Sequence, residues 1–156
     1  MQDTVFTISA LSESPKVAYI DSPLYFYCMR GDSAIHKYTP EFHKTAISVY
    51  NAIKEKLRIC TYIKDVEDVL DYKAICLLIE IYRLEILHSG NKDRFHGKID
   101  AMKRYSNIEP WKSAIHSRHC QYLNRKQRLF KKLEMLGLYR VIYCLLKLQS
   151  IAKRKS

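Results

Sequence analysis

Four polar side chains near the start of the sequence have the chemistry that a reaction centre needs: Asp3, Arg30, Ser33 and His36. A carboxylate can accept a proton from a hydroxyl nucleophile, and the planar guanidinium fork fits phosphate oxygens. An imidazole nitrogen can ligate Mn²⁺ or donate to a phosphate oxygen, and a serine hydroxyl can donate there too. The residue types alone are also compatible with a helix-capping aspartate and a solvated loop that holds an incidental histidine and arginine.

The surrounding pattern predicts one short helix followed by two short strands. Residues 4–13 are expected to form the helix, with Asp3 as its N-cap. Residues 16–20 and 24–30 are rich in Val, Ile, Tyr and Phe, and a turn of Asp, Ser and Pro separates them. They are therefore expected to be strands, so that Arg30 would stand where the second strand gives way to a loop.

These segments together resemble the closing part of the catalytic domain of family 2 glycosyltransferases, which have the GT-A fold. In that family an acidic pair followed by Thr or Trp opens a helix, and a strand leads into Pro-Leu-Tyr-x-Tyr-Arg-x-Arg-x-x-Ser-x-x-His. Here residues 3–6 read Asp-Thr-Val-Phe, residues 23–30 read Pro-Leu-Tyr-Phe-Tyr-Cys-Met-Arg, and Ser33 and His36 follow in register. The resemblance covers about residues 3 to 36.

The resemblance implies a role for each of the four polar residues. Asp3 matches the base that takes the proton from the acceptor hydroxyl during inverting sugar transfer. Arg30 and Ser33 match positions that contact the diphosphate leaving group. His36 matches a histidine that helps to hold either the divalent metal, Mn²⁺ or Mg²⁺, or the diphosphate. The implied activity is transfer of a sugar from a nucleotide-sugar donor to a hydroxyl acceptor, and the expected acceptor is an envelope or surface polysaccharide.

The sequence departs from the family pattern in three respects. Gln2 stands where the family usually has Glu, and Cys28 stands where it usually has Arg. The donor-binding half with its Asp-x-Asp motif, which would precede Asp3, is missing. We therefore expect the C-terminal part of such an enzyme, inactive alone, because catalysis requires base, metal and donor to be held together.

Composition favours a cytoplasmic protein. A peripheral position of the protein on the inner face of the membrane is one option. The five cysteines are odd in number and widely spaced and never form Cys-x-x-Cys, which favours reduced thiols. No secretory leader opens the sequence, and its apolar runs are shorter than the roughly 20 residues that span a bilayer. His116 and His119 could share a metal, but no third ligand is in sight.

The rest of the sequence predicts helices. Apolar residues at three- and four-residue steps mark a helix after Thr39 and Pro40, the expected N-cap and first helical residue. A longer helix is expected over residues 65–88, with its apolar end at the centre of the core. The expected fold class is mainly α with a small β element of two strands. Residues 1–38 would be a remnant of a GT-A-type α/β catalytic domain, and residues 39–156 a helical C-terminal region.

The last third of the sequence carries the excess positive charge. Residues 1–100 hold 13 Lys and Arg against 14 Asp and Glu, whereas residues 101–156 hold 14 against 2. Two basic helices are expected over residues 121–136 and 138–153, joined at Gly137. The first would combine an apolar stripe with cations, and such a helix can lie in the headgroup region of an anionic membrane. The apolar stripe comprises Tyr122, Leu129, Phe130, Leu133 and Leu136, and the cations are Arg125, Lys126, Arg128, Lys131 and Lys132.

Three alternatives remain open for this basic region. The stripe could instead pack on the protein core, with the cations simply solvated. A small basic protein with twelve tyrosines could bind nucleic acid through phosphate contacts and stacking on bases, although no known binding motif is present. The chain could also be a non-catalytic interaction subunit of a separate donor-binding protein.

Overall fold

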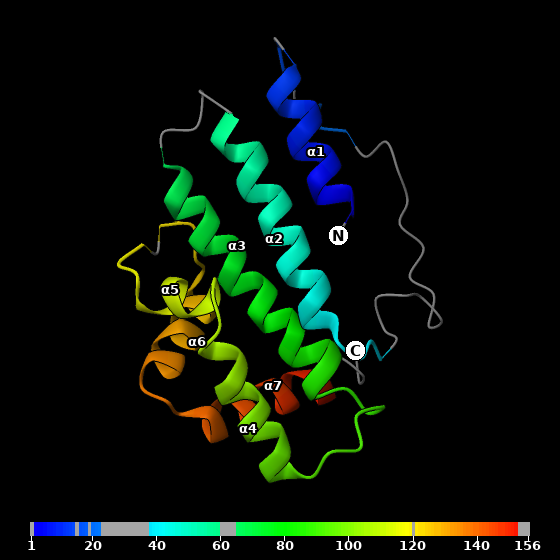
Figure 1. Cartoon of the computed structure of the whole chain (residues 1–156), viewed down its shortest axis with the longest axis vertical. Helices are drawn as coiled ribbons and strands as arrows, with labels where there is room; N and C mark the ends of the chain where they lie inside the picture. Colours follow the sequence, from blue (N-terminus) through cyan, green and yellow to red (C-terminus); the bar gives the residue numbers. More distant parts are fainter. Residues whose placement is uncertain are drawn as a thin grey trace.

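The computed structural model describes residues 2–14, 16–18, 20–22, 38–59, 65–119 and 121–152. Every regular element in these residues is helical, so the part of the chain that the structure describes is mainly α (Figure 1). The elements are α1 (Gln2–Glu13), α2 (Phe42–Ile59), α3 (Val66–Ile81), the π-helical turn η2 (Tyr82–Ile86), α4 (Phe95–Ser106), α5 (Trp111–His116), α6 (Arg125–Met135) and α7 (Tyr139–Ala152). Helix α2 packs between α1 and α3, and α5 and α6 lie on the side of α3 away from α1.

Helix α2 follows the predicted periodicity. Phe42, Ala46, Tyr50, Ile53 and Leu57 are all buried against the core, and they recur at the three- and four-residue steps that place side chains on one helical face. The predicted helix is therefore confirmed, and its apolar face is the one that the sequence indicates.

Helix α3 forms the centre of the core. Ala74, Ile75, Leu78 and Ile81 have no measurable exposure, as the near-continuous apolar run predicts. The predicted helix over residues 65–88 does not remain α-helical to its end, because its last turn widens into η2, where the amide of Leu87 donates to the carbonyl of Tyr82. This five-residue step is the hydrogen bond of a π-helix.

The start of α2 differs from the prediction. The helix begins at Phe42, because Glu41 adopts a positive φ of 59° and interrupts the backbone after Pro40. Thr39 is therefore not the N-cap. Instead the amide of His43, in the first turn, donates to the carboxylate of Glu85 at 2.9 Å. A carboxylate at this end is favoured by the helix dipole, and it comes from a residue 42 positions away.

The predicted β element is not found among the described residues. Residues 16–18 and 20 have no regular structure, so the strand expected over residues 16–20 is not present in them. A strand needs a neighbour to accept its backbone hydrogen bonds, and β-branched and aromatic composition alone does not supply one. The strand expected over residues 24–30 lies outside the described residues.

Candidate functional site

The residues that the glycosyltransferase resemblance points to are mostly outside the described part of the chain. Arg30, Ser33 and His36 lie beyond it, as does the side chain of Asp3. The helix predicted over residues 4–13 begins earlier, at Gln2, so the backbone of Asp3 lies within the first turn of α1 and Asp3 is not its N-cap. The structure therefore leaves the proposed base, diphosphate and metal residues as predictions.

The basic region from Asn124 onward is described in full detail, beginning with the cap of α6. The side-chain oxygen of Asn124 accepts from the amide of Gln127 at 3.0 Å, and the side chain of Gln127 accepts from the amide of Asn124 at 2.9 Å. This reciprocal capping box satisfies two amides that a helix start otherwise leaves without partners. Helix α6 consequently begins at Arg125. The start predicted from the sequence, at residue 121, is therefore wrong.

Four of the five predicted cations are exposed, and the fifth is not. Arg125, Lys126, Arg128 and Lys132 are exposed on α6. Lys131 does not belong to that exposed set, because it is buried and its ammonium group donates to Ser117 Oγ at 2.8 Å and to the carbonyl of His119 at 2.7 Å. Residues 131 and 132 differ because successive side chains of an α-helix point about 100° apart.

The predicted apolar stripe of α6 also divides into two parts. Phe130 is buried in the core and Leu133 is partly buried against it, whereas Tyr122, Leu129 and Leu136 are exposed. The two readings of the stripe, as core and as free surface, therefore each apply to some of its residues. The exposed leucines of α6 lie beside Leu133 at helical spacing, so that they continue outward from the core contact.

Helix α7 extends this exposed apolar face. The chain turns sharply at Gly137, where φ is 68°, and Leu138 N donates back to the carbonyl of Leu133. This bond is characteristic of a Schellman motif. The motif needs a residue in the left-handed conformation, which glycine adopts readily. We call the resulting set the α6–α7 apolar surface, and its exposed members range from 38% to 64% exposure. It comprises Leu129, Leu133, Leu136, Leu138, Val141, Leu145 and Leu148.

A groove of about 280 Å³ cuts into this surface between the end of α3, α6 and α7. Buried Phe130, Ile142 and Leu146 line it together with the more exposed Leu129 and Leu145. The charged side chains that line it are Arg83 and Lys126, and its remaining polar lining residues are Asn124, Gln127 and Gln149. The guanidinium of Arg83 donates to Gln149 Oε1 at 3.1 Å, and this partner is neutral.

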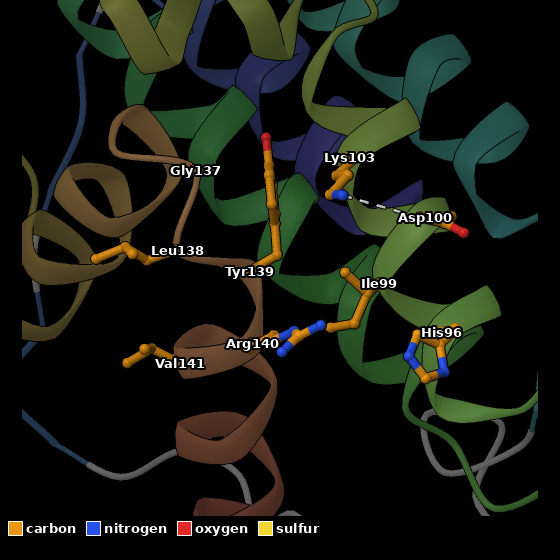
Figure 2. A pocket seen from close by; sticks show the side chains of 9 residues that line it. All are labelled: His96, Ile99, Asp100, Lys103, Gly137, Leu138, Tyr139, Arg140 and Val141. Carbon is orange, nitrogen blue, oxygen red and sulfur yellow. Dashed lines mark ion pairs between the residues drawn. The ribbon is translucent and has the colours of Figure 1, made fainter.

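A second hollow, of about 380 Å³, lies between α4 and the start of α7 (Figure 2). His96, Asp100 and Lys103 line its α4 side, and Figure 2 shows Arg140 extended from α7 toward that wall. Lys103 and Asp100 face each other at 3.9 Å and are both exposed, which makes their ion pair weak. This hollow is open and mixed in charge, and it provides no set of converging groups that indicates a reaction.

Helix α6 is fastened to the core by a buried polar network. Ser106 Oγ of α4 donates to Glu134 Oε2 at 2.7 Å and lies 2.9 Å from the hydroxyl of Tyr82 in η2. Glu134 is only 3% exposed, and its other carboxylate oxygen has no hydrogen-bond partner. Burial raises the pKa of Glu134 to about 7, because a charged carboxylate is disfavoured away from water. Burial likewise raises the pKa of Tyr82 well above its usual value.

A second buried cluster joins α2, η2 and α4 around Glu85. Tyr105 OH donates to Glu85 Oε1 at 2.5 Å, and His43 Nδ1 lies 3.0 Å from the same oxygen. Burial and the Glu85 carboxylate raise the pKa of Tyr105 to about 12. Sequence reasoning missed both clusters, because their members are spread over more than 40 residues and share no local spacing. Glu85 lines neither of the two hollows described above, and the cluster joins the first turn of α2 to η2 and α4.

His116 and His119, the two histidines considered as possible metal ligands, interact with other groups. His116 Nδ1 lies 2.9 Å from the carbonyl of Lys112, and His119 Nδ1 lies 2.9 Å from Asp71 Oδ2. Among the described residues, no three His, Cys, Asp or Glu side chains come together as a metal site would require. None of the described helices is both long and apolar enough to cross a bilayer.

Comparison of the chain with family models, with curated proteins and with solved structures finds no match.

Proposed function

We propose that the chain is the C-terminal part of a family 2 glycosyltransferase whose helical region binds an anionic membrane surface through α6 and α7. The intact enzyme would act in the cytoplasm, at the inner face of the membrane. It would transfer a sugar from a nucleotide donor to a hydroxyl acceptor, with Mn²⁺ or Mg²⁺ assisting departure of the diphosphate. Asp3, Arg30, Ser33 and His36 would take the roles that the resemblance implies. Support for the transferase part is the register of residues 3–36, and α1 begins where that family's pattern places a helix.

The observation that carries the membrane part is the α6–α7 apolar surface with cations beside it. Lys132 lies three residues after Leu129, and Arg125 lies four residues before it, so both are its neighbours on the helix. Between residues 121 and 152 the sequence holds seven Lys and Arg and one acidic residue, Glu134, which is buried. An exposed apolar face with cations and no exposed carboxylate is the pattern of a helix pair that lies in an anionic headgroup region.

The magnitudes are sufficient for reversible binding. Each cation near an anionic membrane contributes about 1 kcal/mol, and four exposed cations on α6 therefore contribute about 4 kcal/mol. Burying the exposed leucine side chains adds about 25 cal/mol per Å² of apolar surface removed from water. Arg125 and Lys126 stand at the N-terminal end of α6, where the helix dipole disfavours cations, and an anionic partner would relieve that cost.

The test is sedimentation with vesicles of phosphatidylcholine alone or with 30 mol% phosphatidylglycerol as the probe composition. The double variant Arg125→Gln with Lys132→Gln should bind the anionic vesicles about 30-fold more weakly at low salt, since it loses about 2 kcal/mol. The matched control is Lys92→Gln with Lys112→Gln, which removes the same charge from exposed positions elsewhere and should change binding little. Equal loss in both double variants would contradict the proposed surface and indicate nonspecific attraction.

Nucleic-acid binding is the rival function, and the same region would carry it. Tyr122 is exposed beside the basic helix and could stack on a base. Against this, Tyr50, Tyr82 and Tyr105 are buried in the core and are not free to stack. A single-stranded oligonucleotide that displaces the chain from anionic vesicles at equal phosphate concentration, and is itself released by salt, would favour the rival.

A further inference from the structure

The groove in the α6–α7 apolar surface has the shape and polarity of a site for one alkyl chain. Its floor is formed by buried Phe130, Ile142 and Leu146, and its rim includes half-exposed Leu129 and Leu145. At about 280 Å³ it is near the lower end of the range for small-molecule pockets. It is therefore large enough for a narrow apolar segment and too small for a folded partner to enter.

The charge at the groove specifies the sign of the ligand's polar end. Arg83 and Lys126 line the groove, and its lining residues include no Asp or Glu. Neither cation forms an ion pair with another described residue. Glu85 and Glu80 are the carboxylates nearest to Arg83 in sequence, and Glu85 is buried against His43 and Tyr105. Burial raises the pKa of Glu80, and Lys73 and Arg83 are among the charges that oppose that rise. An anionic group at the mouth of the groove would meet two cations that form no ion pair within the described residues and no carboxylate among the groove's lining residues.

We propose that this groove takes one acyl chain of an anionic membrane phospholipid, with the lipid phosphate held by Arg83 and Lys126. The inference rests on the proposed membrane function and adds to it a specific lipid site. Membrane binding by surface charge and a shallow leucine face needs no groove, whereas a lipid site withdraws one chain from the bilayer into the protein. The site would fix the orientation of the helical region on the membrane, because Arg83 belongs to η2 and Lys126 to α6.

The test uses the monomeric amphiphile decyl phosphate, below its micelle concentration and without any bilayer, titrated into the full chain by calorimetry. Binding should saturate at one molecule per chain and strengthen with chain length from hexyl to decyl phosphate, by up to about fourfold per buried methylene. Inorganic phosphate should not bind measurably, and decyl phosphocholine should bind more weakly than decyl phosphate. Lack of saturable binding, or equal binding of the zwitterionic and anionic amphiphiles, would overturn the proposal.

Two matched pairs of variants separate the groove from the rest of the surface. Leu145→Trp should fill the groove and weaken decyl phosphate binding at least tenfold, whereas Leu148→Trp, on the same surface but outside the groove lining, should leave it unchanged. Lys126→Gln should weaken the binding, and Lys132→Gln, exposed but not lining the groove, should not. Because both leucines are at least 38% exposed, the tryptophans can be accommodated without repacking the core. Equal effects within either pair would contradict the assignment.

Vesicle sedimentation of the same proteins distinguishes this site from the proposed function. If the chain binds anionic vesicles but not decyl phosphate, the groove proposal fails and the membrane proposal stands. If it binds decyl phosphate but not vesicles, the membrane proposal fails and the phospholipid assignment fails with it, and the groove is then a site for a soluble alkyl phosphate. A dimer that Leu145→Trp dissociates and that excludes decyl phosphate would assign the groove to a second copy of the chain and overturn the inference.

Discussion

Lys131 and Glu134 are less than one turn of helix apart, and both depart from the usual surface position of charged residues. Lys131 is buried with its ammonium group held by a hydroxyl and a carbonyl of the segment after α5. Glu134 is buried beside Ser106 and Tyr82. A buried polar group is tolerated where hydrogen bonds replace water. These two residues therefore anchor α6 and are not available to any ligand at the surface.

The raised pKa of Glu134 predicts a pH-dependent stability. The folded protein binds this proton more tightly than the unfolded chain, because the pKa is about 7 when folded against a reference of 4.5. The contribution is fully present below about pH 4.5 and is lost as pH rises through about 7, on the order of 3 kcal/mol in total. Glu134→Gln keeps the hydrogen-bonding shape without the charge, so its free energy of unfolding should fall less between pH 5 and pH 8.

Urea unfolding at several pH values checks this prediction. The control is Glu55→Gln, which changes an exposed carboxylate on α2 and should keep the wild-type pH dependence. The physical account of Glu134 would be rejected by a Glu134→Gln variant whose stability declines with pH as steeply as that of the wild type.

At the scale of elements, the α6–α7 pair owes its geometry to its ends. The capping box at Asn124 sets where α6 begins, and the left-handed Gly137 sets where it stops and turns. Both signals are readable in the sequence, as Asn-x-x-Gln before a basic amphipathic run and as a glycine between two such runs. The short turn holds the two helices together, and so places the leucines of α7 beside those of α6.

Removing the cap should destabilise α6 in particular. Asn124→Ala loses the side-chain acceptor of the capping box and should lower the free energy of unfolding by about 1 kcal/mol. Asn51→Ala, at an exposed position inside α2, should be neutral or slightly stabilising, because alanine has the higher helix propensity. Thermal unfolding followed by circular dichroism measures both. Native-state hydrogen exchange should further show faster exchange in α6 of Asn124→Ala, and an effect spread evenly over all helices would contradict a local capping role.

At the scale of the whole molecule, buried polar groups fix how the helical layers meet. Glu85 in η2 reaches the first turn of α2 and the hydroxyl of Tyr105 in α4, while Tyr82 in the same turn reaches Ser106 and the network of α6. The two polar side chains of the π-helical turn thus link α2, α4 and α6. Hydrogen bonds of this kind have strict geometry, so they select one arrangement among the many that apolar packing alone would allow.

The proposed relation to glycosyltransferases also predicts a property of the whole chain. Incubation of the purified chain with nucleotide sugars, Mn²⁺ and candidate hydroxyl acceptors should give no sugar transfer above the background without protein. The reason is that the Asp-x-Asp motif of that family is absent from the sequence, and base, metal and donor must be held together for catalysis. Chromatographic detection of released nucleotide and of glycosylated product measures this, and turnover by the chain alone would contradict the prediction.

The sequence by itself determined most of the helical architecture. Apolar periodicity located α2, the apolar run located α3, and Gly137 located the turn between α6 and α7. These features depend on local steric preference and on which side of a helix is apolar, and both are written in consecutive residues. The same local reasoning was wrong about the strand over residues 16–20 and about Thr39 as the N-cap, because strand pairing and that cap require partners distant in the chain.

Only the tertiary structure decided which parts of the basic helices are surface. The sequence presented five cations and five apolar residues on the helix predicted over residues 121–136. Packing buried Lys131 and Phe130 and left Lys132 and Leu129 exposed. The groove between α3, α6 and α7, and the joining of Glu134 to Ser106 and Tyr82, likewise depend on how separate helices meet. A periodic pattern shows that a helix has an apolar side. How much of that side a neighbouring helix buries is decided only when the helices pack together.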